Sequence, residues 1–249
     1  MTLEEKELAK RASELSHRSL SRFVYTETHF LTEGEQALVD GLSLPCPASF
    51  EGGYEDAERC IAVFGRKEDL GYAWESSIVL LEISPKDLKF AEDLTHRDFL
   101  GAIMNTGIRR ELLGDLLVQE KSAYLFILQS MAPYLCEHLE RVRHTAVKVH
   151  VLETLPTAVS VRTEKKQVVV ASARVDALVC GVFGLSRSEG KALVEKEKVS
   201  IRGKIITDGA KEALAGDRIS VRGYGRFYFD SMGGQTRSGR CHANIRIFL

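Results

Sequence analysis

The spacing of the apolar residues changes twice along the chain and divides it into three regions. In the first region Leu8, Ala12 and Leu15 recur at helical spacing with charged residues between them, which predicts an amphipathic helix. A capping-box pattern that begins at Thr32 predicts the start of a second, shorter helix. Residues 1–58 are therefore expected to form a helical N-terminal region.

Residues 59–169 alternate between strand-like and helix-like segments. Apolar runs at 60–64 and 77–83 predict strands, and the second run is continuous enough for the centre of a sheet. The segments that follow are predicted, in chain order, as a helix at 95–106, strands at 112–118 and 123–128, a helix at 131–143 and a strand at 146–152. From residue 77 onward this is the β-α-β-β-α-β order of a ferredoxin-like sheet, similar in layout to an RRM. The strands lack the aromatic-rich motif of an RRM, so RNA stacking on this sheet is not predicted.

Residues 170–249 begin with two short helices joined by a tight turn. Apolar residues between Val175 and Val182 lie at i, i+3, i+4 and i+7 and form one buried stripe, and Gly184 ends the helix. The capping-box pattern from Ser186 to Glu189 predicts that a second helix starts there. The three regions together predict an α+β protein.

Small strands follow these two helices. Segments 199–201 and 204–206 are predicted as a hairpin around Arg202 and Gly203, which would form a two-residue turn. A further strand is predicted at 218–222, with its apolar residues on one face and the arginines at its two ends on the other.

The charge of the chain is unevenly distributed. The net charge is −1, but from Ser172 to the end 14 basic residues stand against 8 acidic ones, and the rest of the chain is net acidic. This segregation indicates a C-terminal module that meets a polyanion. Charge counts alone leave open the alternative of chance segregation on solvated faces.

Basic residues in this module gather at helix starts and turns, where several can converge on one phosphate backbone. Arg187 would lie at the start of a helix, where backbone N–H groups favour a phosphate, and Lys191 lies one turn later on the same side. The candidate RNA-binding residues are Arg174, Ser186, Arg187, Lys191, Lys198, Arg202, Lys204, Arg222 and Arg226.

A second basic patch lies in the middle region and comprises His96, Arg97, Arg109 and Arg110. One interpretation places these residues in the first turn and just beyond the end of a helix, where they serve the fold. The other makes them a second surface that touches RNA phosphate. The sequence favours neither interpretation over the other.

The remaining composition narrows the class of protein. The five cysteines, Cys46, Cys60, Cys136, Cys180 and Cys241, are scattered and lack metal-ligand spacing, which argues against a zinc site or a disulfide framework. The chain has neither an apolar run long enough for a membrane span nor a signal-peptide pattern at its start. A cytoplasmic protein is expected, without a cofactor, a metal, a membrane partner or a small-molecule substrate.

Several spaced motifs of the C-terminal region resemble the RNA-binding domain named after ribosomal protein S-four, also called the αL motif. The matching elements are Arg174-x-Asp176, Ser186-Arg187, Val199-x-Ile201-x-Gly203-Lys204 and Ala215-Gly216-Asp217-x-Ile219-x-Val221. The hairpin of this domain usually carries Asn where this chain has Arg202, and Gly is frequent at the position of Glu197.

The resemblance extends over nearly the whole chain to the bacterial YlmH family. The motifs that carry it are Glu51-Gly52-Gly53-Tyr54, Ala57-Glu58-Arg59, His96-Arg97-Asp98-Phe99-Leu100-Gly101, Gly107-Ile108-Arg109-Arg110, Gly114-Asp115, Gly223-x-Gly225-Arg226-Phe227 and Thr236-Arg237-Ser238-Gly239-Arg240. The resemblance implies domains at 1–58, 59–169 and 170–249. It also implies a non-catalytic protein that binds large-subunit ribosomal RNA, with tRNA as a further partner, in quality control of stalled translation.

Two other functions are weighed against this expectation. S-four-type modules often accompany pseudouridine synthase or methyltransferase domains, so an RNA-modifying enzyme or its accessory subunit is one alternative. The Gly-rich loop that a methyltransferase needs after a strand is missing, and so is a synthase-like aspartate motif. The other alternative is a protein-interaction adaptor linked to cell division, in which the acidic N-terminal helices bind a partner.

Overall fold

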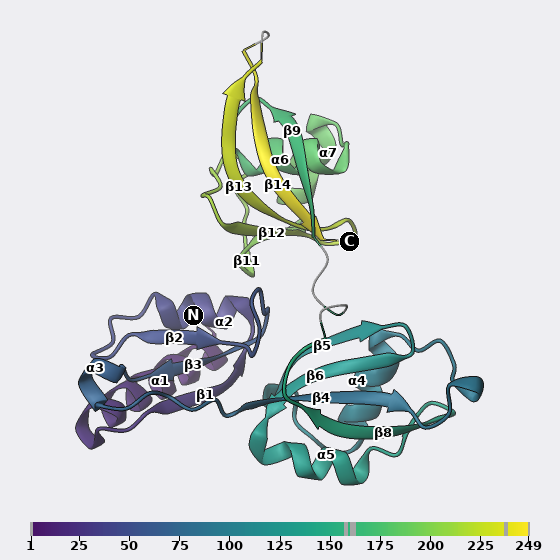
Figure 1. The fold of residues 1–249 in the computed structure, drawn as a ribbon. Coiled ribbons are helices and arrows are strands. Elements are labelled where there is room, and N and C mark those ends of the chain that lie inside the picture. Colours follow the sequence, from purple (N-terminus) through teal and green to yellow (C-terminus); the bar gives the residue numbers. More distant parts are fainter. Residues whose placement is uncertain (1, 157–158, 160–162, 237–238, 249) are drawn as a thin grey trace. The chain divides into compact units, whose positions relative to one another are not determined.

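The computed structural model describes residues 2–156, 159, 163–236 and 239–248, and the motif residues Arg237 and Ser238 lie outside this range. Helices pack against antiparallel sheets, as expected for an α+β protein (Figure 1). The chain forms two compact units, Met1–Ser160 and Val161–Leu249. The second unit therefore begins earlier than the predicted boundary near residue 169.

The first part of unit 1 is a helix-covered sheet. Helix α1 (Leu3–Arg22) and helix α2 (Glu33–Asp40) lie on one face of a three-stranded sheet with the order β1 (Thr26–Leu31), β3 (Cys60–Phe64), β2 (Ala48–Glu51), followed by the short helix α3 (Lys67–Leu70). Both predicted helices are present, and the capping box between Thr32 and Glu35 is formed. Ala12, Leu15 and Val39 pack against the apolar side chains of β3.

Two predictions for this part were wrong. The N-terminal region is not simply helical, because β1 and β2 contribute a sheet, and β3 belongs to that sheet rather than to the middle one. All five residues of β3 are buried, as befits the central strand between β1 and β2. An apolar run reveals a buried strand but does not reveal which sheet it joins.

The second part of unit 1 has the predicted β-α-β-β-α-β order. Its main elements are β4 (Ile78–Pro85), α4 (His96–Asn105), β5 (Leu113–Gln119), β6 (Ser122–Leu128), α5 (Ala132–His138) and β8 (Thr145–Leu152), with short 3₁₀ turns at Leu88–Phe90, Arg110–Leu112 and Gln129–Met131. The sheet order is β5-β6-β4-β8-β7, where β7 is the short strand Arg141–Val142, and each neighbouring pair is antiparallel. Both helices pack on one face of this sheet through Phe99, Ile103 and Leu135.

The second helix of this part ends earlier than predicted. Its predicted range of 131–143 stops at His138 in the structure, and Arg141–Val142 form the edge strand β7 against β8. Leu139 takes an extended conformation, and both Leu139 and Val142 are buried in the core beneath the sheet. Burial of these two side chains therefore overrides the helical spacing of the segment.

The helix-free face of the middle sheet is partly covered by the N-terminal sheet. Phe30, Ile61 and Val63 of the N-terminal sheet form one buried cluster with Leu80 of β4 and Phe126 of β6. The ring of Tyr54 stacks on Phe126, with 4.8 Å between the ring centroids. The central strands of this face, which an RRM would use to stack RNA bases, are thus partly covered within unit 1.

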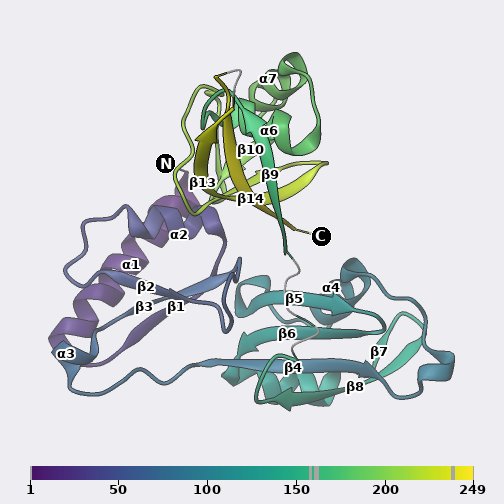
Figure 2. The same ribbon diagram turned by 45° about the horizontal axis from the view of Figure 1, so that its top comes forward.

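Unit 2 is a six-stranded sheet packed against two helices, as Figure 2 shows. Its elements are β9 (Thr163–Val170), α6 (Val175–Phe183), α7 (Arg187–Glu195), β10 (Val199–Ile201), β11 (Lys204–Ile205), β12 (Asp217–Val221), β13 (Gly225–Gln235) and β14 (Cys241–Phe248). The sheet order is β11-β10-β12-β13-β14-β9. Strand β9 pairs with β14 along its whole length, so a fragment that starts at Ser172 would lack an edge strand of this sheet.

The two helices and the first hairpin of unit 2 form where the sequence predicted them. Gly184 ends α6 in the left-handed conformation, and the capping box between Ser186 and Glu189 starts α7. Arg218 is buried on β12, and its guanidinium lies 5.9 Å from the ring centre of Tyr228.

Candidate nucleic-acid interface

The junction of α6 and α7 forms a basic hollow. Arg174, Arg187 and Lys191 line it together with Asp176 and Cys180, and its volume is about 320 Å³. We call this surface the α6–α7 hollow. Three of the candidate RNA-binding residues, which are up to 17 positions apart in the sequence, therefore share one surface.

The close approach of the two helices depends on Gly190. A β-carbon at this position would overlap the sulfur of Cys180 and lie 3.2 Å from the backbone oxygen of Asp176. Only glycine allows α7 to pack this tightly against α6, so Gly190 fixes the separation between the basic side chains of the two helices.

We expect Gly190→Ala to destabilise unit 2 by about 2 kcal/mol, because the added methyl group overpacks the contact between the helices. Denaturant unfolding followed by circular dichroism would measure the loss. Combining Gly190→Ala with Cys180→Ala should recover part of it, since the sulfur is the atom that the methyl group overlaps. Equal stability of Gly190→Ala and the wild type would show that the helices can separate at little cost.

The three cations of the α6–α7 hollow differ in how their charges are balanced. Arg174 binds the carboxylate of Asp176 through two hydrogen bonds of 3.0 and 2.6 Å, which lower the pKa of Asp176 and raise that of Arg174. Lys191 faces Glu195 at 3.5 Å on the exposed side of α7. Within the described part of the chain, Arg187 forms no ion pair, and it is exposed in the first turn of α7. Arg187 is therefore the cation best placed to bind an external anion.

A second hollow of about 500 Å³ lies beside the first hairpin of unit 2. Lys198, Arg222 and Arg226 line it, and we call it the Lys198 hollow. The backbone N–H of Arg222 donates to the oxygen of Lys198 at 2.8 Å, which holds the two residues side by side. The guanidinium of Arg226 lies 4.5 Å from the ring centre of Phe248.

The hairpin turn has the two residues that the spacing predicted. Arg202 and Gly203 both have positive φ, at 45° and 72°, as in a type I′ two-residue turn. The guanidinium of Arg202 binds the buried carboxylate of Asp217 at 3.0 Å, while Lys204 is exposed on β11. The ion pair with Asp217 holds the Arg202 side chain, which offsets the strain of an arginine at positive φ.

The arginines of the basic patch in the middle region differ in their exposure and contacts. Arg97 is exposed in the first turn of α4, and Arg109 is exposed and pairs with Glu111 at 3.0 Å. Arg110 instead donates to the backbone oxygens of Leu113 and Gly114 at 2.8 and 3.1 Å. Burial, together with repulsion from Arg59, lowers the pKa of Arg110 to about 10.

Arg110 belongs to a polar junction that joins the two parts of unit 1. The buried carboxylate of Asp115 accepts hydrogen bonds from the hydroxyl of Tyr54 at 2.8 Å and from the backbone N–H groups of Glu58 and Arg59 at 2.6 and 3.2 Å. The guanidinium of Arg59 donates to the oxygens of Leu113 and Phe30 at 2.9 and 3.1 Å. We call Tyr54, Arg59, Arg110 and Asp115 the polar junction.

His96 lies next to the polar junction. Partial burial of its ring, followed by repulsion from Arg110, lowers its pKa. Asp115 and Arg59 were not singled out by the charge pattern, although both lie within the quoted motifs. The motifs in this region thus include residues that hold unit 1 together.

Metal sites and membrane-spanning helices were also sought among the described residues. These residues contain no group of three or more His, Cys, Asp or Glu side chains that could hold a metal ion. Among the helices of the same residues, none has the length and apolar character needed to span a membrane.

The chain is similar in sequence to a named bacterial protein and in fold to a solved structure. The chain is 26% identical over 216 residues to the ribosome-associated protein quality control protein P2 of Bacillus subtilis (strain 168), and the match covers 86% of this chain and 83% of that protein. The solved structure of the cell division protein YlmH from Streptococcus pneumoniae matches with a TM-score of 0.52 and 18% identity, over 61% of this chain and 93% of that one. This last likeness concerns the fold alone.

A family model described as a putative RNA-binding domain in YlmH matches residues 74–155, which span the middle sheet and its two helices. Residues 74–155 are therefore similar to the putative RNA-binding domain of YlmH, and the resemblance of the chain to the YlmH family is confirmed.

Proposed function

We propose that this protein binds structured ribosomal RNA without catalysing a reaction on it, as a cytoplasmic, bacterial protein of ribosome-associated quality control. The protein binds to the large ribosomal subunit, and tRNA is a neighbouring partner. The middle domain is ferredoxin-like, and the C-terminal domain is of the S-four type. The observation that carries this proposal is the α6–α7 hollow, which brings three cations together at the start of a helix.

The chemistry of the α6–α7 hollow suits an RNA backbone. The start of α7 presents backbone N–H groups, the exposed Arg187 lies in its first turn, and Lys191 stands one turn later. The Lys198 hollow adds three further basic side chains in the same unit. Folded RNA is recognised largely through its shape and its phosphates, which such surfaces can contact without reading bases.

The relatives also support a role in RNA binding at the ribosome. The Bacillus subtilis protein is named for ribosome-associated quality control, and the family model that matches residues 74–155 describes a putative RNA-binding domain. Neither description names an enzymatic activity. A search by mass spectrometry for modified nucleosides after incubation with RNA would reveal an RNA-modifying enzyme, and finding any would overturn the non-catalytic assignment.

Affinity for ribosomal RNA should fall steeply with salt if phosphate contacts dominate. The two hollows together hold six basic side chains, so we expect binding to weaken about a hundredfold or more between about 50 and 200 mM salt. Filter binding of the full chain to ribosomal RNA would measure this slope. An affinity that stays constant across the same range would contradict binding through these surfaces.

A second function follows from the name of the Streptococcus pneumoniae protein, which is called a cell division protein. In this alternative the chain is an adaptor whose N-terminal helices contact a partner protein. Pull-down from nuclease-treated lysate separates the two functions, because partners held through RNA are lost while direct protein partners remain.

A further inference from the structure

A third concave surface lies in unit 1 and is separate from the polar junction. It is formed by α1, the start of β1 and residues 72–77, which lead into β4, and its volume is about 620 Å³. We call it the Trp74 hollow. The charges and rings that line it were not singled out by the sequence, because they come from segments that are about 60 residues apart.

Two arginines of α1 face the Trp74 hollow. Arg11 and Arg18 lie seven residues apart, so both are on one side of the helix, with the buried Leu15 between them. Both arginines are exposed, and neither forms an ion pair with any residue that the structure describes. Two unpaired guanidinium groups beside one hollow favour an anionic ligand such as a phosphate.

Aromatic rings also line the Trp74 hollow. Trp74 is partly buried and packs against the apolar cluster that contains Phe30 and Phe126. Tyr72 keeps 46% of its surface exposed, and its ring meets that of Tyr25 edge to face, with 5.3 Å between the ring centroids. The hydroxyl of Tyr25 donates to the backbone oxygen of Tyr72 at 3.0 Å. These contacts hold the rings in place before any ligand arrives, which suits the stacking of a flat base.

Polar groups that could read the edge of a base complete the lining. The side-chain oxygen of Ser77 is buried and lacks a hydrogen-bond partner within the described residues. Buried polar atoms without a partner are rare, and Ser77 is one of the residues that line this hollow. Glu27 and Glu75 supply carboxylates at the same hollow. A carboxylate can accept hydrogen bonds from two N–H groups on the Watson–Crick edge of guanine but from only one on that of uracil.

We propose that the Trp74 hollow binds one unpaired nucleotide of an RNA strand, with its phosphate on Arg11 and Arg18 and its base against Trp74 and Tyr72. The inference rests on the proposed function as an RNA-binding protein and names a second contact for it. It also gives the RNA-binding domain at residues 74–155 a base-stacking surface, although the centre of its sheet is partly covered.

Trp74 is the single tryptophan of the chain, so its fluorescence reports directly on this hollow. Titration of the full chain with a six-nucleotide single-stranded RNA should quench this fluorescence to saturation, and a guanine-rich strand should bind more tightly than oligouridine. A duplex of the same length should quench it far less, because its bases are already stacked. Free guanosine monophosphate should quench it only at much higher concentration, which separates a strand from a free nucleotide.

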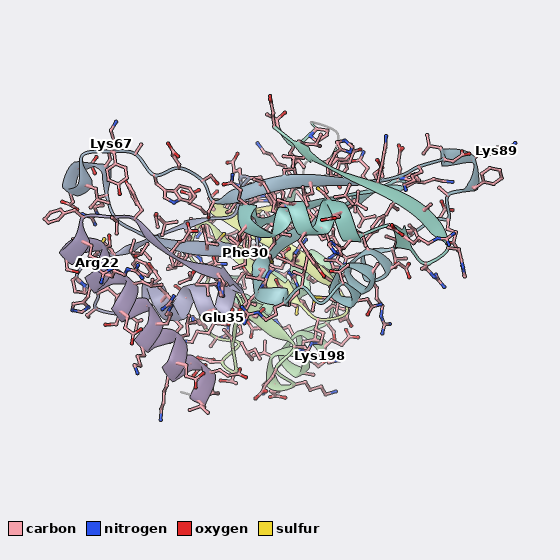
Figure 3. The ribbon with its side chains drawn as sticks, turned by 90° about the horizontal axis from the view of Figure 1, so that it is seen from below. Arg22, Phe30, Glu35, Lys67, Lys89 and Lys198 are labelled. Carbon is pink, nitrogen blue, oxygen red and sulfur yellow. The ribbon has the colours of Figure 1, made fainter. Side chains whose placement is uncertain are left out.

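Variants of α1 test whether Arg11 and Arg18 contribute to RNA binding at the Trp74 hollow. The double change Arg11→Ala and Arg18→Ala should weaken the quenching titration about tenfold, since two phosphate contacts are lost. Arg22→Ala serves as the control, because Arg22 lies on the same helix, as labelled in Figure 3, but outside the hollow. Tyr72→Ala should lower the affinity as well, through the loss of a stacking surface.

The outcomes distinguish this inference from the proposed function. If Arg187→Glu with Lys191→Glu abolishes filter binding to ribosomal RNA while single-stranded RNA still quenches Trp74, both stand. If ribosomal RNA binds but Trp74 fluorescence never changes, the inference is overturned and the proposed function remains. Equal loss with Arg22→Ala, or equal quenching by duplex RNA, would also overturn the inference.

Discussion

Replacing both Arg187 and Lys191 by glutamate is expected to abolish binding to ribosomal RNA at physiological salt. The two side chains line the α6–α7 hollow with Arg174, and Arg187 is exposed and unpaired among the described residues. The substitutions remove two phosphate contacts and place two negative charges against the RNA backbone. We expect the affinity to fall about a hundredfold or more, as measured by filter binding.

The fold should tolerate this pair of substitutions. Arg187 is the first residue of α7, where an acidic side chain interacts favourably with the helix dipole. Glutamate at position 191 would repel Glu195 one turn away, at a cost of about 0.5 kcal/mol in this exposed position. Circular dichroism and thermal unfolding should therefore be close to those of the wild type, which separates lost binding from lost structure.

A control with the same change in net charge is available in the same unit. Lys165 and Lys166 are exposed on β9 and line neither hollow. Lys165→Glu with Lys166→Glu should weaken RNA binding only slightly, through the long-range field of the unit. If this control lost as much affinity as the hollow variant, binding would depend on overall charge, and the assignment to the α6–α7 hollow would be wrong.

Asp115→Ala is expected to destabilise unit 1 by about 3 kcal/mol, because it removes the buried charge that two arginines share. Asp115 accepts three hydrogen bonds from Tyr54, Glu58 and Arg59, and its replacement removes all three. Arg59 and Arg110 already repel each other, and burial lowers the pKa of both. Urea unfolding followed by Trp74 fluorescence measures this unit specifically.

Graded variants test the cause of that loss. Asp115→Asn keeps an acceptor but removes the charge, so it should cost less than Asp115→Ala. Tyr54→Phe removes a single hydrogen bond and should cost about 1 kcal/mol, while the ring still stacks on Phe126. If Asp115→Ala unfolded at the same urea concentration as the wild type, the polar junction would contribute nothing to the stability of unit 1.

Local patterns in the sequence predicted the elements around the candidate site. The capping box at Ser186 and the left-handed end of α6 at Gly184 depend only on neighbouring residues, and both are present in the structure. The same holds for the Arg202–Gly203 turn, which is set by the chirality of a two-residue hairpin. The α6–α7 hollow follows from these local features together with the tight packing at Gly190.

Long-range pairing was not predictable in the same way. Strand β3 joins β1 and β2 rather than the middle sheet, and β9 joins β14 from the far end of the chain. The sequence left the role of Arg110 open, and the structure binds it to backbone oxygens of its neighbours, while Arg218 is buried. A charged residue in a sequence gives no sign of whether its partners are water, RNA or the backbone of a distant segment.

The central claim is that this protein docks on the large ribosomal subunit through the α6–α7 hollow. Cosedimentation of the full chain with separated ribosomal subunits tests it most directly. The wild type and the Lys165→Glu, Lys166→Glu control should sediment with the large subunit, while the Arg187→Glu, Lys191→Glu variant should stay in the supernatant. A wild type that sediments with neither subunit, or a hollow variant that sediments as well as the wild type, would contradict the claim.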